Sequence, residues 1–196
     1  MKKKIATVTR ETKETQIKCT VNVWGTGKYN VKTGIGFLDH MLELFSKHSL
    51  IDLDLEVKGD LKVDEHHAVE DTALVLGEAI NKALGDKKGI KRYGFLLPMD
   101  EALTEVAIDL GGRPYLVFNC KFNRDRVGDL PTELVEDFFY ALASTLKAAI
   151  HINLKYGRNE HHKIEGIFKA FAHAMRNACD EDFRAVNKLP STKGVL

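Results

Sequence analysis

His66-His67-Ala68-Val69-Glu70 and His161-His162-Lys163-Ile164-Glu165 repeat one pattern, two adjacent histidines followed by a glutamate, 95 residues apart in the chain. A second pair of segments repeats upstream: Phe37-Leu38-Asp39-His40-Met41 aligns with Leu134-Val135-Glu136-Asp137-Phe138 at an offset of 97 residues. The expected order strand, helix, strand, helix also agrees between the two halves. Because each half is too small to bury a core well alone, the repeat predicts two duplicated halves packed together.

Hydrophobic periodicity gives the expected elements. Alternation of apolar and polar residues predicts strands, and apolar residues spaced three and four apart predict helices. The expected strands cover two segments within 4–24, then 50–57, 102–110, 115–120 and 150–155; the expected helices cover 37–48, 66–84, 132–149 and the segment from about 159. We therefore expect an α+β fold of two pseudo-repeated half-domains, each a mixed β-sheet packed against two helices, around one core. The whole chain, 1–196, is expected to be one domain, with halves at approximately 1–90 and 91–182 and a tail at 183–196.

The composition excludes several classes of protein. Of 196 residues, 44% are apolar and 29% charged, which is typical of a globular chain and not of a disordered one. Twenty-nine Lys and Arg against 28 Asp and Glu give a net charge of +1, so we expect no nucleic-acid and no membrane partner. There is no apolar run of about 18 residues, and Ile5–Thr9 is too short for a signal-peptide core. The chain is expected to be cytoplasmic, with three free, mostly buried cysteines.

The repeated pattern predicts metal binding. Residues four apart share a helix face, so His66 with Glu70, and His161 with Glu165, can each grip one ion as a claw. His67 and His162 point about 100° away from their neighbours. Each claw is therefore expected to take the lone histidine of the other motif.

Two more residues complete the expected ligand sets. His40 is assigned to the first claw, and Asp137, which occupies the equivalent place in the repeat, to the second. The predicted sets are His40, His66, Glu70 and His162 for one ion and His67, Asp137, His161 and Glu165 for the other. Mixed nitrogen and oxygen ligands suit Mn, Fe, Ni, Co or Zn. For Asp137 two roles stay open: a direct ligand, or an acid that holds a water or orients a ligand histidine.

Four segments closely resemble one enzyme family over nearly the whole chain. They are Gly36–Leu42 (GFLDHML), Asp64–Asp71 (DEHHAVED), Asp109–Pro114 (DLGGRP) and His161–Phe171 (HHKIEGIFKAF). Together they resemble imidazoleglycerol-phosphate dehydratase, a lyase of L-histidine biosynthesis, in its monofunctional form. The resemblance implies dehydration of D-erythro-imidazole glycerol phosphate to imidazole acetol phosphate, two manganese ions per active site, and a homo-24-mer with active sites between subunits.

The same resemblance implies a role for each site residue. Its metal ligands fall on His40, His66, His67, Glu70, His161, His162 and Glu165, and Asp137 stands where the family often has histidine. Glu14 falls on the catalytic acid–base. The substrate-binding positions are Glu14, His40, His48, His66, Glu70, Arg92, Arg113, His161, Ser191 and Lys193, with Arg92, Arg113, Ser191 and Lys193 at the phosphate and His48 nearby. Composition alone predicts a disordered tail, whereas the resemblance gives the tail a function.

The chemistry of such a substrate explains the need for metal. The hydrogen to be removed has no carbonyl beside it, so the imidazole ring must absorb the electrons as a metal-bound imidazolate. The alternative from the residues is a dinuclear metal-dependent phosphatase or hydrolase, which would also use His and Glu ligands. A structural or storage metal protein is a third reading.

Overall fold

Alternating burial defines the strands of two sheets. In the computed structural model, which describes residues 4–196 and only the backbone of residues 95–97, buried and exposed side chains alternate along β2 (Thr15–Asn22) and β4 (Asp52–Gly59). The same holds for β6 (Ala102–Asp109). One face of each sheet packs on the core and the other faces water, which is the usual origin of this alternation.

The two sheets have the same topology. The first has the order β1 (Ile5–Glu11), β2, β4, β3 (Tyr29–Lys32), and the second β5 (Tyr93–Met99), β6, β10 (Ala149–Tyr156), β7 (Tyr115–Asn119). In each sheet the first three strands pair antiparallel and the last pair is parallel. A short ribbon of β8 (Arg126–Val127) and β9 (Leu130–Pro131) is added in the second half.

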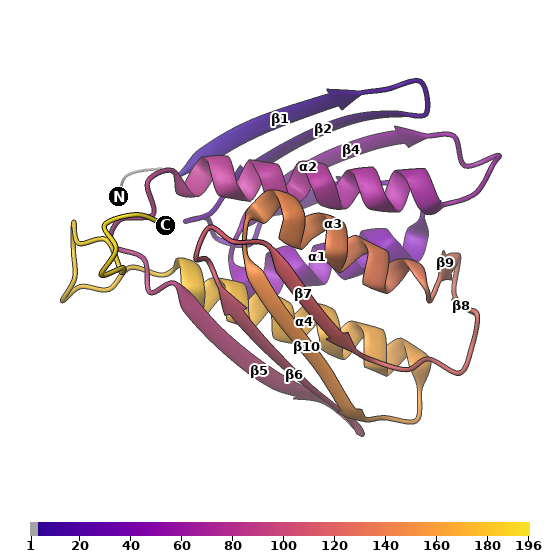
Figure 1. The fold of residues 1–196 in the computed structure, drawn as a ribbon. Coiled ribbons are helices and arrows are strands. Elements are labelled where there is room, and N and C mark those ends of the chain that lie inside the picture. The colour runs from indigo at the N-terminus through magenta and orange to yellow at the C-terminus, as the bar shows by residue number, and fades with distance from the viewer. Residues whose placement is uncertain (1–3) are drawn as a thin grey trace.

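Four helices lie between the two sheets (Figure 1). They are α1 (Gly36–Ser49), α2 (His66–Leu84), α3 (Leu134–Leu146) and α4 (Glu160–Cys179). The main helix contacts cross between the halves, because α2 packs on α3 and α1 packs on α4. Phe45 stacks on Phe171 at a centroid distance of 5.5 Å within the shared core. The predicted α+β fold of two pseudo-repeated half-domains around one core is confirmed.

Some expected elements differ from the observed ones for physical reasons. The helix expected over 132–149 ends at Leu146, because Lys147 adopts a left-handed backbone with φ of 55° and the chain turns into β10. The periodicity did not indicate β3, which buries only Val31 of its four side chains. Nor did it indicate β5, where Gly94 lies directly against the backbone of Ala174 on α4 and leaves no room for a side chain. These strands depend on tertiary contacts.

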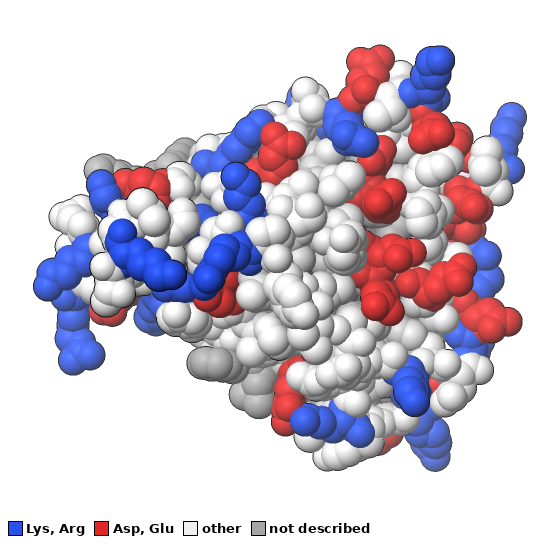
Figure 2. All heavy atoms as spheres, in the orientation of Figure 1, with Lys and Arg blue, Asp and Glu red and all other residues white. Residues whose placement is uncertain are grey.

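Residues 126–131 hold the starts of two helices. The Asp129 carboxylate accepts the backbone N–H groups of Gly36 at 2.5 Å and Phe37 at 2.9 Å, which caps α1. Arg126 forms an ion pair with Glu65, the residue before α2. Asp and Glu gather around the N-terminal ends of α2 and α3, whereas Lys and Arg gather at the end that carries the tail (Figure 2).

Backbone hydrogen bonds hold the start of the tail against the segment that follows α2. Gly89 donates to the Lys188 carbonyl, Asp182 donates to the Gly89 carbonyl, and Ile90 bridges to Glu181. The three cysteines are free, as expected, and burial raises the pKa of each thiol to about 12. Among the described residues, no helix is long and apolar enough to cross a membrane.

Candidate metal centre and substrate site

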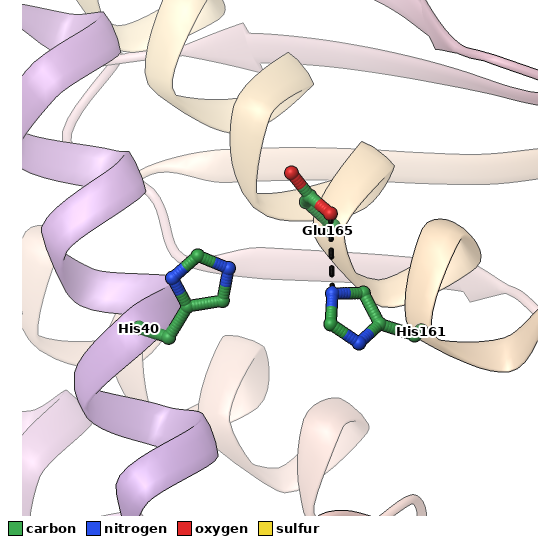
Figure 3. A group of neighbouring side chains, drawn as sticks. All are labelled: His40, His161 and Glu165. Atoms are coloured by element: carbon green, nitrogen blue, oxygen red, sulfur yellow. Dashed lines mark ion pairs between the residues drawn. The ribbon is translucent and has the colours of Figure 1, made fainter.

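His40 on α1 meets His161 and Glu165 on α4 in one group of ligand side chains (Figure 3). One ligand atom of each lies within 4.8 Å of the other two, and within the described part of the chain this is the one such group of three or more. Nε2 of His161 is 3.3 Å from Oε2 of Glu165, one helical turn further on. Two imidazoles and a carboxylate that converge in this way form a donor set that suits a divalent transition metal.

The start of α4 fixes the position of His161. The Asn159 side-chain oxygen accepts the backbone N–H of His161 at 2.9 Å and so caps the helix. The ring of Phe37 packs edge-on against His161 at 5.1 Å between centroids. His161 therefore packs beside both Phe37 and His40, with its Nε2 toward Glu165.

Glu165 is held as a carboxylate. Its side chain is only 10% exposed, and Lys169 Nζ lies 2.6 Å from its Oε1. Burial alone would raise the pKa of Glu165, but the bond from Lys169 and the nearby imidazoles of His161 and His40 outweigh it, so that the pKa is lowered. An ionised oxygen is the form that binds a cation.

A second group joins α2 and α3. Nε2 of His66 is 3.8 Å from Oε2 of Glu70, and Nδ1 of His66 is 3.8 Å from Oδ2 of Asp137. The two carboxylates face opposite nitrogens of one ring, so the three side chains do not converge on one point as those around His161 do. Its composition, one imidazole with two carboxylates, suits a harder cation.

Within one chain, the side chains are grouped differently from the predicted ligand sets. His40 lies with His161 and Glu165, not with His66 and Glu70, and Asp137 lies with His66. The physical reason is the crossed helix packing: α1 contacts α4 and α3 contacts α2. Each claw therefore receives its third side chain from the other half of the chain.

The lone histidines are fixed by carboxylates of their own chain. Nδ1 of His67 lies 3.1 Å from Oδ2 of Asp60, and Nδ1 of His162 lies 2.7 Å from Oε2 of Glu101. These hydrogen bonds raise the pKa of both histidines, and the bond from His162 helps to lower the pKa of Glu101 to about 2. Neither lone histidine joins the group around His161, and the exchange of lone histidines between claws does not form within one chain.

Glu14 lies beside a lone histidine. It is in the turn between β1 and β2, and its Oε2 is 3.8 Å from Nε2 of His67. The buried Asp71 docks this hairpin on α2, because it accepts a hydrogen bond from Thr15 Oγ1 at 2.5 Å and pairs with Arg10 Nε at 2.9 Å. The predicted catalytic glutamate thus lies near Nε2 of His67, the ring nitrogen that Asp60 does not contact.

The four residues predicted at the phosphate come together. Arg92, Arg113, Ser191 and Lys193 line one pocket of about 700 Å³, formed by the tail and the Gly111–Gly112 turn. Arg92 is oriented by Asp109, with Nη2 to Oδ2 at 2.8 Å, and its Nη1 donates to the Pro190 carbonyl at 2.9 Å. Arginine and lysine at a concave site suit a phosphate.

His48 lies near the end of α1, where its ring centroid is 5.3 Å from that of His173 on α4. Burial lowers the pKa of His48, and the nearby His173 and Lys169 lower it further. Burial likewise lowers the pKa of His173. The two imidazoles are therefore favoured as neutral groups.

Several residues of the site were missed from the sequence. Asp60, Glu101, Lys169 and Asp109 contact predicted site residues, yet none belongs to the repeated pattern. Lys169 was the easiest of these to predict from the sequence, since it follows Glu165 by one helical turn. Glu101 gave no local signal, because 61 residues separate it from His162.

Comparisons with known proteins identify the family of this chain. The family model described as imidazoleglycerol-phosphate dehydratase matches residues 33–175. The imidazoleglycerol-phosphate dehydratase of Clostridium botulinum strain Okra is 56% identical over 197 residues, covering 100% of both chains. The histidine biosynthesis bifunctional protein of Spirosoma linguale is 55% identical over 191 residues, which is 97% of this chain and 50% of that protein.

Solved structures of the same enzyme have the same fold. The imidazoleglycerol-phosphate dehydratase of Staphylococcus aureus superposes with a TM-score of 0.82 at 40% identity, covering 91% of this chain and 99% of that one. The Pyrococcus furiosus enzyme also gives 0.82, at 35% identity, covering 96% and 100%. The chain therefore belongs to the imidazoleglycerol-phosphate dehydratase family, the hydro-lyases of histidine biosynthesis.

Proposed function

We propose that the enzyme dehydrates D-erythro-imidazole glycerol phosphate to imidazole acetol phosphate in L-histidine biosynthesis. The observation that carries the proposal is the doubled histidine–carboxylate group, one on α1 and α4 and the other on α2 and α3. If each group held a metal ion, the pair would offer one ion for each nitrogen of an imidazole ring. A pocket with Arg92, Arg113 and Lys193 supports a substrate that carries phosphate.

Two manganese ions per active site are proposed, and the imidazole and carboxylate chemistry of the two groups supports them. One ion would be held by His40, His161 and Glu165, and the other by His66, Glu70 and Asp137, with His67 and His162 as further ligands. When bound, the ions supply Lewis acidity that lowers the pKa of the substrate's imidazole and favours its imidazolate. Asp137 is proposed as a ligand, directly or through one water, because its oxygen already lies 3.8 Å from the His66 ring.

Glu14 is the proposed acid–base. The substrate loses its C3 hydroxyl and its C2 hydrogen, and the resulting enol tautomerises to the ketone. The C2 hydrogen is not acidic, since no carbonyl adjoins it, so a positioned carboxylate must accept the proton. Glu14 lies 3.8 Å from Nε2 of His67 and is held there by the Thr15–Asp71 bond. It thereby lies beside a proposed metal ligand without being part of either claw.

Assembly is proposed to complete the active sites. His67 and His162 have their Nδ1 atoms bonded to Asp60 and Glu101 and do not join the His161 group of their own chain. We propose that they serve the claws of neighbouring copies in a homo-24-mer, so that active sites lie between subunits. The enzyme is proposed to act in the cytoplasm, with no nucleic-acid or membrane partner.

Product analysis tests the proposed reaction. The manganese-loaded protein is incubated with imidazole glycerol phosphate, and both the ketone product and inorganic phosphate are measured. We expect ketone that retains the phosphate. Release of inorganic phosphate would instead support the dinuclear phosphatase, and no product of either kind would reject both. The Glu14→Gln variant serves as control, because it should bind two ions and yet form no ketone.

A further inference from the structure

The two first hairpins of the repeat carry equivalent glutamates. Glu14 is the residue immediately before β2, and Glu101 is the residue immediately before β6, the corresponding strand of the second sheet. Each contacts the lone histidine of its own half, His67 or His162. They contact opposite nitrogens, however: Glu14 lies near Nε2 and Glu101 is bonded to Nδ1.

We propose that Glu101 is a positioning residue that fixes the tautomer of His162, so that the Nε2 atom of this histidine is left bare for the metal. The inference rests on the proposed metal sites. In the first half Asp60 takes the Nδ1 atom of His67, which leaves Glu14 on the Nε2 side. In the second half the glutamate itself takes Nδ1. The two equivalent glutamates therefore have different proposed roles: Glu14 is the acid–base, and Glu101 orients His162.

The contacts of Glu101 require both of its carboxylate oxygens to act as hydrogen-bond acceptors. Oε2 lies 2.7 Å from Nδ1 of His162, while Oε1 accepts the backbone N–H of Asn159 at 2.9 Å and that of Arg158 at 3.3 Å. Backbone N–H groups only donate, so Oε1 must remain an acceptor. In a carboxylate the other oxygen, Oε2, is also an acceptor, so it accepts a hydrogen bond from His162. The ring proton is then on Nδ1, and Nε2 keeps a free lone pair.

Glutamine at this position would reverse the tautomer. Its amide oxygen would keep the two backbone bonds, and its NH2 group would face His162. The NH2 group donates to Nδ1, so the ring proton moves to Nε2 and that atom can no longer bind a metal. The size and the backbone bonds are retained, so the change acts on the tautomer and not on the start of α4.

Asp60 provides the matched comparison. Its two oxygens lie 3.2 and 3.1 Å from the same Nδ1 of His67, and no backbone N–H of a described residue bonds to either. The amide of Asp60→Asn can therefore turn its oxygen toward Nδ1–H and preserve the tautomer. The two isosteric changes are expected to differ.

Metal affinity and histidine tautomer test the proposal in the full-length protein. Glu101→Gln should lower the affinity for one of the two manganese ions by about 10- to 100-fold, the loss typical of an outer partner of a metal ligand. Asp60→Asn and the surface control Glu105→Gln should bind both ions with the affinity of the parent. Solid-state NMR of metal-free protein labelled with ¹⁵N-histidine should show His162 protonated on Nδ1 in the parent and on Nε2 in Glu101→Gln. Adding Glu101→Gln to His162→Ala should cost no further affinity.

Each outcome decides the question. Parent-like affinity for both ions in Glu101→Gln, an unchanged His162 tautomer, or an equal loss in Asp60→Asn would overturn the proposal. A parent protein that binds manganese and forms the ketone keeps the proposed function intact in that case. A parent that binds no manganese would instead contradict the proposed function itself.

Discussion

The ring centroid of His40 lies 6.0 Å from that of His161, although the two residues belong to different halves of the chain. The contact is part of a parallel packing of α1 on α4, which continues through Phe45 on Phe171 and His48 on His173. A ligand group built in this way requires both halves in one folded core. Neither half alone contains a complete set of its side chains.

The two claws should lose different ions when their glutamates are changed. Glu165→Gln removes the charge that faces His161 and Lys169, and Glu70→Gln removes the charge that faces His66. Because each is a proposed direct ligand, the loss of affinity should exceed the roughly 10- to 100-fold typical of an outer partner. Metal analysis after dialysis should find one ion retained in each variant. Two retained ions in both variants would contradict the two-claw arrangement.

Asp137 should contribute to the affinity for the ion of the first claw, His66 with Glu70. Asp137→Ala removes the carboxylate 3.8 Å from His66 and should weaken that ion, whereas Asp137→His should restore binding because imidazole is also a ligand. Titration of metal-free protein with manganese measures both. Glu136→Ala, on the preceding helical position, is the control. Full activity and two tightly bound ions in Asp137→Ala would show that Asp137 is no ligand.

Lys193 should act on substrate binding and not on metal content. It lines the pocket with Arg92, so Lys193→Ala should raise KM about tenfold, the scale of one charged hydrogen bond, with little change in kcat. Lys188→Ala, in the same tail, is the matched control. Steady-state kinetics and metal analysis are measured together. If KM and kcat both stay at parent values, the tail does not hold the phosphate.

Removal of metal should weaken the assembly. If His67 and His162 ligate ions of neighbouring copies, chelation breaks links between subunits. Size-exclusion chromatography with light scattering should then show smaller particles, and manganese should restore the large one. A particle that keeps its size after chelation, with metal loss verified, would mean that assembly does not depend on the ions.

The bond between Glu101 and His162 predicts a pH window in the metal-free protein. The pKa of Glu101 is lowered to about 2, so its contribution to stability is present above its unfolded value of roughly 4.3 and is lost as pH falls toward 2. The pKa of His162 is raised, so its contribution is present below roughly 6.5 and is lost as pH rises through the folded value.

Urea unfolding measures this window. The stability difference between the parent and Glu101→Gln should be largest near pH 5.5 and should shrink at both pH 8 and pH 2.5. Glu105→Gln, on the exposed face of β6, is the control and should show no such maximum. A difference that is constant with pH would argue against the ion pair.

Local pattern was enough to predict most of the elements and to select residues that the fold brings together in the candidate site. The helix expected over 66–84 is α2, and the repeated His-His-x-x-Glu pattern fixes each claw, because residues four apart share a face in any helix. Local pattern did not predict β5, which is a strand because Gly94 lies against α4, nor the early end of α3 at Lys147.

Tertiary structure decided which side chains meet. Periodicity shows that α1 and α3 each present an apolar face, but it does not say which of the other helices covers it. Packing of α1 on α4 and of α3 on α2 places His40 with His161 and Asp137 with His66, the reverse of the grouping expected from sequence order. The bond from His162 to Glu101 likewise exists only because a hairpin tip and a helix start, 61 residues apart, are brought together by folding. The sequence alone shows which residues can bind a metal, because this depends on the type of each side chain. Which of these side chains lie together depends on distances that only the folded core defines.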